Sequence, residues 1–168
     1  MVPVWFTLLA LAIFLAMEGV AWWSHRYVMH GPIGWVWHRS HHAPRTGLFE
    51  TNDLYGVLGA VLGTGLFVAA MGLGSWPLRA VATGVTLYGL AYAFVHDGLV
   101  HQRWPFRWVP MNGYARRLIK AHRLHHAVQT REGAVSFGFV LAPDPRRLHA
   151  ILKARRADRA GSSVRAGP

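Results

Sequence analysis

The chain has 168 residues, a length that allows one domain, and 52% of them are hydrophobic. It contains no cysteine, which excludes disulfides, thiolate metal sites and cysteine nucleophiles, so any bound metal must be held by nitrogen or oxygen. The formal net charge of +11 favours anionic lipids or an acidic protein as partners. Nucleic acid is excluded as a partner because the basic residues flank apolar segments instead of forming a basic soluble face.

Three nearly uncharged segments are long enough to be membrane spans. About 20 apolar residues cross the hydrocarbon core as a helix, and the segments cover residues 3–23, 54–76 and 79–98. The first could instead be a cleaved signal peptide, but it lacks a basic start and runs directly into a histidine pair. The short link between the other two predicts a helical hairpin, and the length of both runs disfavours a buried soluble helix pair. The sequence thus predicts an all-α membrane bundle with about three to four transmembrane helices.

The basic residues predict the orientation of these spans. Seventeen of the eighteen Lys and Arg lie in residues 24–53 and 97–168, on one side of a three-span topology, and only Arg79 lies on the other. The positive-inside rule makes the first side cytoplasmic. We therefore expect a cytoplasmic histidine-rich cap and a cytoplasmic C-terminus.

The C-terminal third contains a short apolar segment followed by a segment rich in arginine. Residues 133–142 are apolar but too short to span, which predicts a re-entrant or interfacial segment. Beyond Pro143, Leu148, Ile151 and Leu152 share one helical face among arginines, as in a helix that lies on an anionic membrane. We expect residues 1–152 to form one domain and residues 153–168 a basic tail, disordered from about residue 161.

Ten of the eleven histidines fall in four groups with a repeating pattern. Each half of the chain has an HX4H pair followed by an HXXHH triplet. The four groups are His25 and His30; His38, His41 and His42; His96 and His101; and His122, His125 and His126. The eleventh, His149, is interpreted as a surface residue.

The spacing predicts that these imidazoles converge. Residues three and four apart are neighbours on a helix, so an HXXHH triplet presents its rings to one region. The two rings of an HX4H pair are about 140° apart on an ideal helix. Either the helix end distorts or the two rings reach different metals, and the spacing alone leaves both possibilities open.

The donor set indicates the metal. Imidazole suits iron, zinc, copper and nickel, and ten such ligands exceed what one ion can use, so two ions are expected. Iron is favoured over zinc because zinc sites are usually four-coordinate.

Four carboxylates are candidates to accept a hydrogen bond from a ligand ring, as metal-binding histidines usually require. Asp97 adjoins His96 and could equally be a polar residue at a helix end. Glu18 lies in the first span, where a carboxylate is costly and tends to be functional; pairing with a cytoplasmic-side arginine is the alternative. Glu50 and Asp53 could instead be helix-start residues, and Asn52 or Asp53 could cap the second span.

The motif order and the strings FETNDLYGV, VHDGLVHQRWPFRWVP, AHRLHHAV and EGAVSFGF closely resemble the bacterial β-carotene hydroxylases, within the membrane fatty-acid hydroxylase and sterol desaturase superfamily. The resemblance covers residues from about 5 to 152 and includes all four histidine motifs. It implies O2-dependent hydroxylation at C3 and C3′ of carotenoid β-ionone rings, from β-carotene through β-cryptoxanthin to zeaxanthin, or from canthaxanthin towards astaxanthin. It also implies two iron ions held by the ten histidines, and a place in the bacterial inner membrane.

A carotenoid would reach the site from the lipid. Trp35, Trp37, Trp104, Phe106 and Trp108 are candidates to line its ring pocket, although an interfacial aromatic belt explains them equally well.

Electrons must come from a partner, since the chain has neither cysteine for a cluster nor a G-x-G-x-x-G loop. A ferredoxin with its reductase is expected. Five basic residues could dock it or could bind anionic headgroups: Arg116, Arg117, Lys120, Arg123 and Arg131.

Two alternatives remain. Another lipid or sterol hydroxylase, or a carotenoid ketolase, would share the histidine pattern, and only the resemblance favours the hydroxylase. A histidine-rich membrane metal transporter would carry histidines along its spans, whereas these gather at the span ends.

Overall fold

The computed structural model describes residues 4–45, 47–105 and 107–165, and the regular secondary structure of these residues is all helical, as predicted. Three segments are long and apolar enough to cross a membrane: Val4–Met29, Asp53–Gly72 and Trp76–Val100. Large apolar side chains such as Leu11, Leu62 and Leu90 point outward on them. Exposed apolar surface of this kind suits contact with lipid instead of water.

Two of these segments change helix type near their ends. Helix α1 (Val4–Trp23) continues as the π-helix η1 (Ser24–Met29), and α4 (Trp76–Tyr92) continues as the π-helix η2 (Ala93–Val100). Helix α3 (Asp53–Gly72) stays regular throughout.

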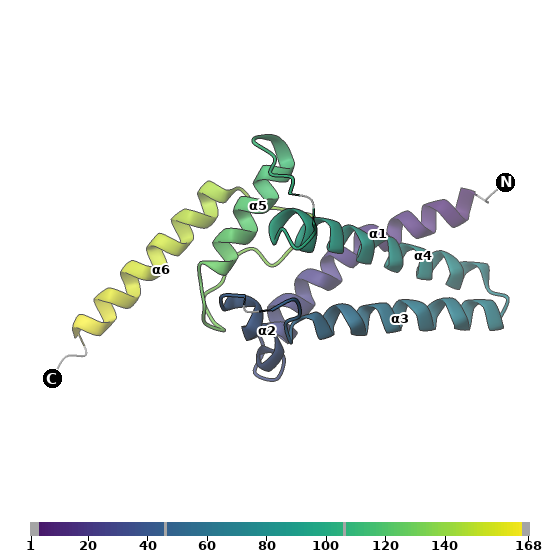
Figure 1. Cartoon of the computed structure of the whole chain (residues 1–168), viewed down its shortest axis with the longest axis horizontal. Helices are drawn as coiled ribbons and strands as arrows, with labels where there is room; N and C mark the ends of the chain where they lie inside the picture. Colours follow the sequence, from purple (N-terminus) through teal and green to yellow (C-terminus); the bar gives the residue numbers. More distant parts are fainter. Residues whose placement is uncertain (1–3, 46, 106, 166–168) are drawn as a thin grey trace.

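The spans pack with α4 between α1 and α3 (Figure 1). A side chain at Gly84 of α4 would lie 2.5 Å from the carbonyl of Ala10 in α1, so glycine permits this close helix approach. The hairpin between α3 and α4 turns at Gly74, whose φ is +60°, and Ser75 caps α4 by accepting the N–H of Leu78.

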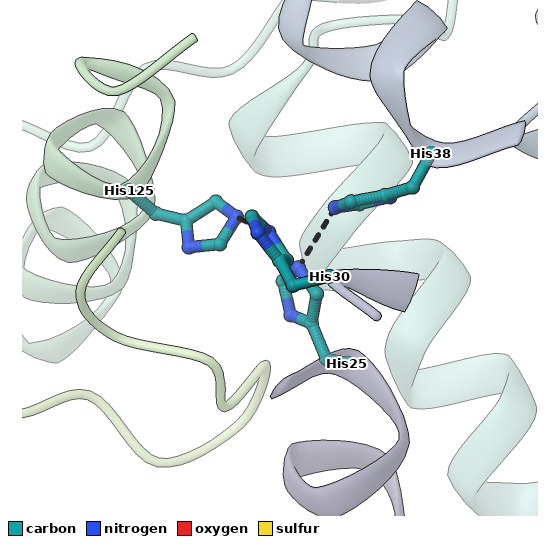
Figure 2. A group of neighbouring side chains, drawn as sticks. All are labelled: His25, His30, His38 and His125. Atoms are coloured by element: carbon teal, nitrogen blue, oxygen red, sulfur yellow. Dashed lines mark hydrogen bonds between the residues drawn. The ribbon is translucent and has the colours of Figure 1, made fainter. Parts of the chain in front are cut away.

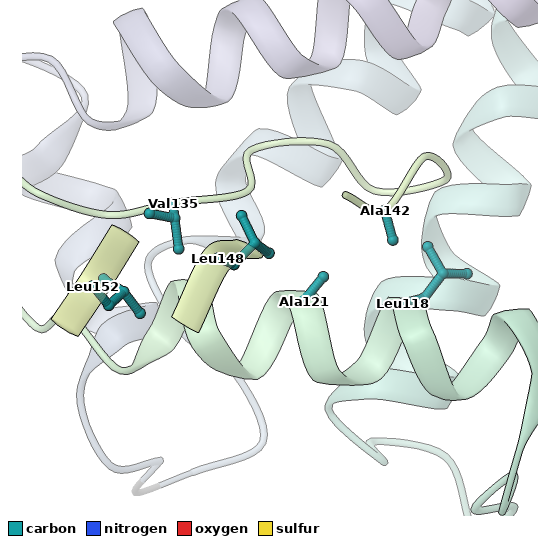
Figure 3. Packing of buried hydrophobic residues seen from close by; sticks show 6 residues of the cluster. All are labelled: Leu118, Ala121, Val135, Ala142, Leu148 and Leu152. Carbon is teal, nitrogen blue, oxygen red and sulfur yellow. The ribbon is translucent and has the colours of Figure 1, made fainter. Parts of the chain in front are cut away.

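A second packing unit follows the spans. It consists of α5 (Gly113–His126), α6 (Pro145–Arg165) and the non-helical segment between them, while the short helix α2 (Trp35–His42) lies beside η1. Its apolar core, shown in Figure 3, comprises Leu118, Ala121, Val135, Ala142, Leu148 and Leu152. Segment 133–142 is thus held between α5, α6 and the span ends.

Helix α6 extends away from the rest of the molecule (Figure 1) and continues to Arg165. The disorder expected from residue 161 stays a prediction, and residues 166–168 lie outside the described part of the chain.

Candidate metal centre

Both HX4H pairs lie at π-helical span ends. The N–H of His30 donates to the carbonyl of His25, and the N–H of His101 donates to that of His96, each over 3.0 Å and five residues. Hydrogen bonds from i to i+5 widen the turn, so that residues five apart face nearly the same way. The helix ends therefore distort, and the two rings of each pair reach the same region.

Five rings form what we call the first histidine group. Figure 2 shows four of them pointing toward one another from three separate parts of the chain. The Nε2 of His38 lies 3.1 Å from that of His25 and 3.2 Å from that of His42. The Nε2 of His125 lies 3.3 Å from that of His30 and 3.1 Å from that of His42. The members of the group are His25, His30, His38, His42 and His125.

The other five rings form the second histidine group in the same manner. The Nε2 atoms of His41 and His96 are 2.9 Å apart. Those of His101 and His126 lie 3.2 Å and 2.9 Å from the Nε2 of His122. The members of this group are His41, His96, His101, His122 and His126.

Each group takes four rings from one half of the chain and its fifth ring from the other half. In α2 the outer histidines, His38 and His42, join the first group, and the middle one, His41, joins the second. The middle histidine of α5, His125, joins the first group. On a helix the middle position of HXXHH points about 100° away from the last, which is why it reaches the neighbouring group. The groups touch, since the rings of His42 and His126 are 4.6 Å apart.

Oxygen acceptors orient most of these rings. Seven of the ten have Nδ1 within 2.7–3.0 Å of an oxygen. Backbone carbonyls of Phe137, Arg131, Val128 and Val135 accept from His25, His30, His42 and His125, while side-chain oxygens of Asn52, Glu50 and Asp97 accept from His38, His41 and His96. A neutral ring that donates through Nδ1 presents a lone pair at Nε2.

The Nε2 spacing fits a metal ion. Two lone pairs that face each other at 2.9–3.3 Å repel unless a cation lies between them. Imidazole nitrogens bind metals such as zinc at about 2.0–2.1 Å, and two such ligands at right angles would be about 3.0 Å apart. The donor set therefore matches two neighbouring nitrogen-ligated metal ions.

Burial keeps the rings neutral. Burial is the largest cause that lowers the pKa of His38 to about 2, of His42 to about 4 and of His101 to about 3, while hydrogen bonds to Asn52 and to the carbonyl of Val128 act in the opposite direction on His38 and His42. It also lowers the pKa of His122 and His125 well below the ordinary range. Neutral imidazole is the metal-binding form, so these rings need lose no proton near pH 7 to coordinate.

The four candidate carboxylates divide into two pairs. Glu50 and Asp97 contact ligand rings directly, each at 2.9 Å. Asp53 instead makes a bidentate ion pair with Arg103, both oxygens at 2.6 Å. Glu18 accepts hydrogen bonds from residues 139–141 and from a tyrosine, not from an arginine.

Two kinds of hydrogen-bond acceptor for the histidine rings were not predicted from the sequence. Asn52 makes no capping bond; it is 3% exposed, and its Oδ1 accepts from His38 at 2.7 Å. Its position, at a span start soon after HXXHH, was the available signal. The carbonyl acceptors of residues 128–137 leave no side-chain signal at all.

The candidate pocket aromatics are dispersed. Trp35 adjoins the first group, its ring 5.2 Å from those of His30 and His42. Trp104 packs against Phe94, whereas Trp37 and Trp108 are 42% and 54% exposed. Phe106 lies outside the described residues.

A cleft of about 450 Å³ borders both groups. His41, His101 and His126 line it together with Arg103 and Arg123. Among the other candidate docking residues, Arg117, Lys120 and Arg131 are exposed and Arg116 is half-buried, and His149 is exposed as predicted.

Three apolar helices, two of which end in HX4H pairs that belong to two adjacent histidine groups, define a membrane protein built to bind metal. The sequence model of the fatty acid hydroxylase family matches residues 10–143, and the chain belongs to this family.

Curated relatives of similar sequence agree with this family assignment. A beta-carotene hydroxylase of Pseudescherichia vulneris is 58% identical over 84% of this chain and 79% of its own length. One from Pantoea ananas is 50% identical over 97% of this chain and 92% of its own, and one from Paracoccus sp. (strain PC1) is 54% identical over 87% and 90%. No solved structure matches the chain significantly.

Proposed function

We propose that this chain is a beta-carotene 3-hydroxylase. It uses O2 to hydroxylate C3 and C3′ of β-ionone rings, converting β-carotene through β-cryptoxanthin to zeaxanthin and canthaxanthin to astaxanthin. The observation that carries the proposal is the pair of five-histidine groups, in a chain whose relatives at 50–58% identity are named beta-carotene hydroxylases.

The proposed cofactor is a pair of non-haem iron ions, one held by each histidine group. A ring C–H bond offers no acidic proton, so acid–base catalysis by side chains cannot begin the reaction. Bound iron supplies the activation of O2 that amino-acid side chains lack. The balanced reaction takes the substrate R–H, O2, two electrons and two protons to R–OH and water.

The protein's own part is to position the metal ions and to exclude water from the site. The ten rings would hold the ions, and oxygen acceptors at the Nδ1 atoms of seven of them fix the orientation of those rings. The apolar segment 133–142 covers the first group, with the rings of Phe137 and Phe139 against His25. Water is thereby kept from that side of the site.

We place the enzyme in the bacterial inner membrane, with the histidine groups and the C-terminus in the cytoplasm. Support comes from the three apolar helices and from the seventeen Lys and Arg on one side of them. The carotenoid, being apolar, enters from the lipid, and Trp35 beside the first group is the best-placed tryptophan to contact its ring.

The proposed electron donor is an acidic ferredoxin supplied by its reductase. Support comes from the exposed Arg117, Lys120 and Arg123 on α5, the helix that also carries three of the ten histidines. Helix α6 is proposed to lie on anionic lipid, with Lys153, Arg155 and Arg156 exposed.

Expression in a bacterium that makes β-carotene tests the function. Pigment chromatography should show zeaxanthin and its β-cryptoxanthin intermediate. Ketolated pigments would identify a ketolase instead. Unchanged β-carotene beside membrane-inserted, iron-loaded protein would overturn the assignment.

A further inference from the structure

The first span contains one buried carboxylate that takes no part in the histidine groups. Glu18 is 8% exposed and lies in α1, where an ionisable side chain is costly in lipid. It accepts hydrogen bonds from the backbone N–H groups of Phe139, Val140 and Leu141, at 2.8 to 3.2 Å. Tyr88 of α4 donates its hydroxyl to the same carboxylate at 2.6 Å. Successive backbone N–H groups around one anion form a strong, directional anchor.

The anchored segment reaches both histidine groups. The carbonyl of Phe137 accepts the Nδ1–H of His25 at 3.0 Å. The ring of Phe139 stacks on His25 with centroids 5.0 Å apart and an angle of 11°, and its edge meets His96 at 5.4 Å. One segment therefore touches a ring of the first group and a ring of the second.

The fit between carboxylate and segment is close. A Cβ at residue 138 would lie 2.6 Å from Oε1 of Glu18 and 2.9 Å from the carbonyl of Leu141, so Gly138 is needed there. Ser136, two residues earlier, has a φ of +61°, a conformation that non-glycine residues adopt only when their surroundings impose it.

We propose that Glu18 is a positioning residue for the hydroxylation reaction. From within the membrane it holds residues 139–141, and through them it sets the orientation of His25 and the place of Phe139 between the rings of His25 and His96. The inference rests on the proposed function for its catalytic readout, whereas its spectroscopic readout rests only on the proposed binding of iron.

Glu18→Gln is the direct test because it keeps the size of the side chain. The amide can accept through only one oxygen, and its NH2 would face backbone donors. Glu132→Gln is the matched control, since this carboxylate adjoins the same segment and its side chain is 75% exposed. Both variants are made in the full-length chain, purified in lipid nanodiscs and loaded with ferrous iron.

We expect Glu18→Gln to keep about two irons per chain, to lose at least ten-fold in turnover per bound iron, and to shift the Mössbauer spectrum of the iron. Glu132→Gln should match the wild type in all three. If the hydrogen bonds to Glu18 only stabilise the fold, Glu18→Gln should yield less folded protein, but normal turnover and an unchanged spectrum per bound iron. That result would overturn the proposal.

Tyr88→Phe decides the matter if Glu18→Gln fails to fold. It removes one hydroxyl and leaves the three backbone bonds to Glu18, so the same spectral shift and a smaller loss of turnover are expected. Wild-type turnover and spectrum in this variant would then refute the inference. If the wild type binds iron yet makes no zeaxanthin, the proposed function fails while the spectral comparison still tests Glu18.

Discussion

Replacing Asn52 with alanine should weaken metal binding by the first histidine group. The side chain is 3% exposed, and its Oδ1 accepts from Nδ1 of His38 at 2.7 Å. Without it, a buried N–H is left unsatisfied, at a cost of about 1–3 kcal/mol. At 1.4 kcal/mol per factor of ten, this is about 5- to 150-fold in affinity, in line with the roughly 10- to 100-fold effect of removing the hydrogen-bond partner of a metal ligand.

The assay is an anaerobic Fe²⁺ titration against a competing chelator. One of two ions should be lost at chelator concentrations that the wild type withstands. Asn52→Asp keeps an acceptor for His38 and should retain most of the affinity. Asn112→Ala is the control, because Asn112 is exposed and makes no capping bond with its side chain.

Equal iron affinity in the wild type and in Asn52→Ala would refute the reasoning. It would mean that His38 is oriented by packing alone, or that it does not bind the metal. A loss of both ions together would show instead that the two groups bind as one cooperative unit.

Further predictions concern His41 and His125, each of which joins the histidine group formed mainly by the other half of the chain, and the packing of the spans. His41→Ala and His125→Ala should each abolish zeaxanthin formation and retain about one tightly held iron while the chain still inserts. His149→Ala is the control and should behave as the wild type. Substantial activity in His41→Ala and His125→Ala would contradict the ligand assignment. Gly84→Val should lower the thermal midpoint, because overpacking costs about 1–3 kcal/mol and the new side chain would meet the α1 backbone. Gly65→Ala, where nothing lies within 4 Å, is its control, and equal midpoints for the two variants would contradict the packing argument.

The sequence by itself determined the helical class, the apolar helices and the ten histidines. Each depends on local information: a run of about 20 apolar residues is readable without tertiary contacts, and so is the repeat of HX4H and HXXHH. The absence of cysteine and the scarcity of carboxylates likewise limited the ligands to imidazole.

Only the tertiary structure decided how the histidines divide. The π-helical ends are seen in backbone hydrogen bonds that no residue pattern specified, and they direct both rings of each pair to one group. His41 and His125 cross to the opposite group because the direction of each depends on how α2 and α5 sit against the span ends.

The same holds for the groups that orient the rings. Backbone carbonyls carry no side-chain identity, so the acceptors for His25 and His125 become visible only once segment 133–142 is in place. Glu18 stood out in the sequence as a costly charge in a span, but the backbone N–H groups that it binds lie more than 120 residues away along the chain. Contacts at that separation are set by packing, which local patterns do not encode.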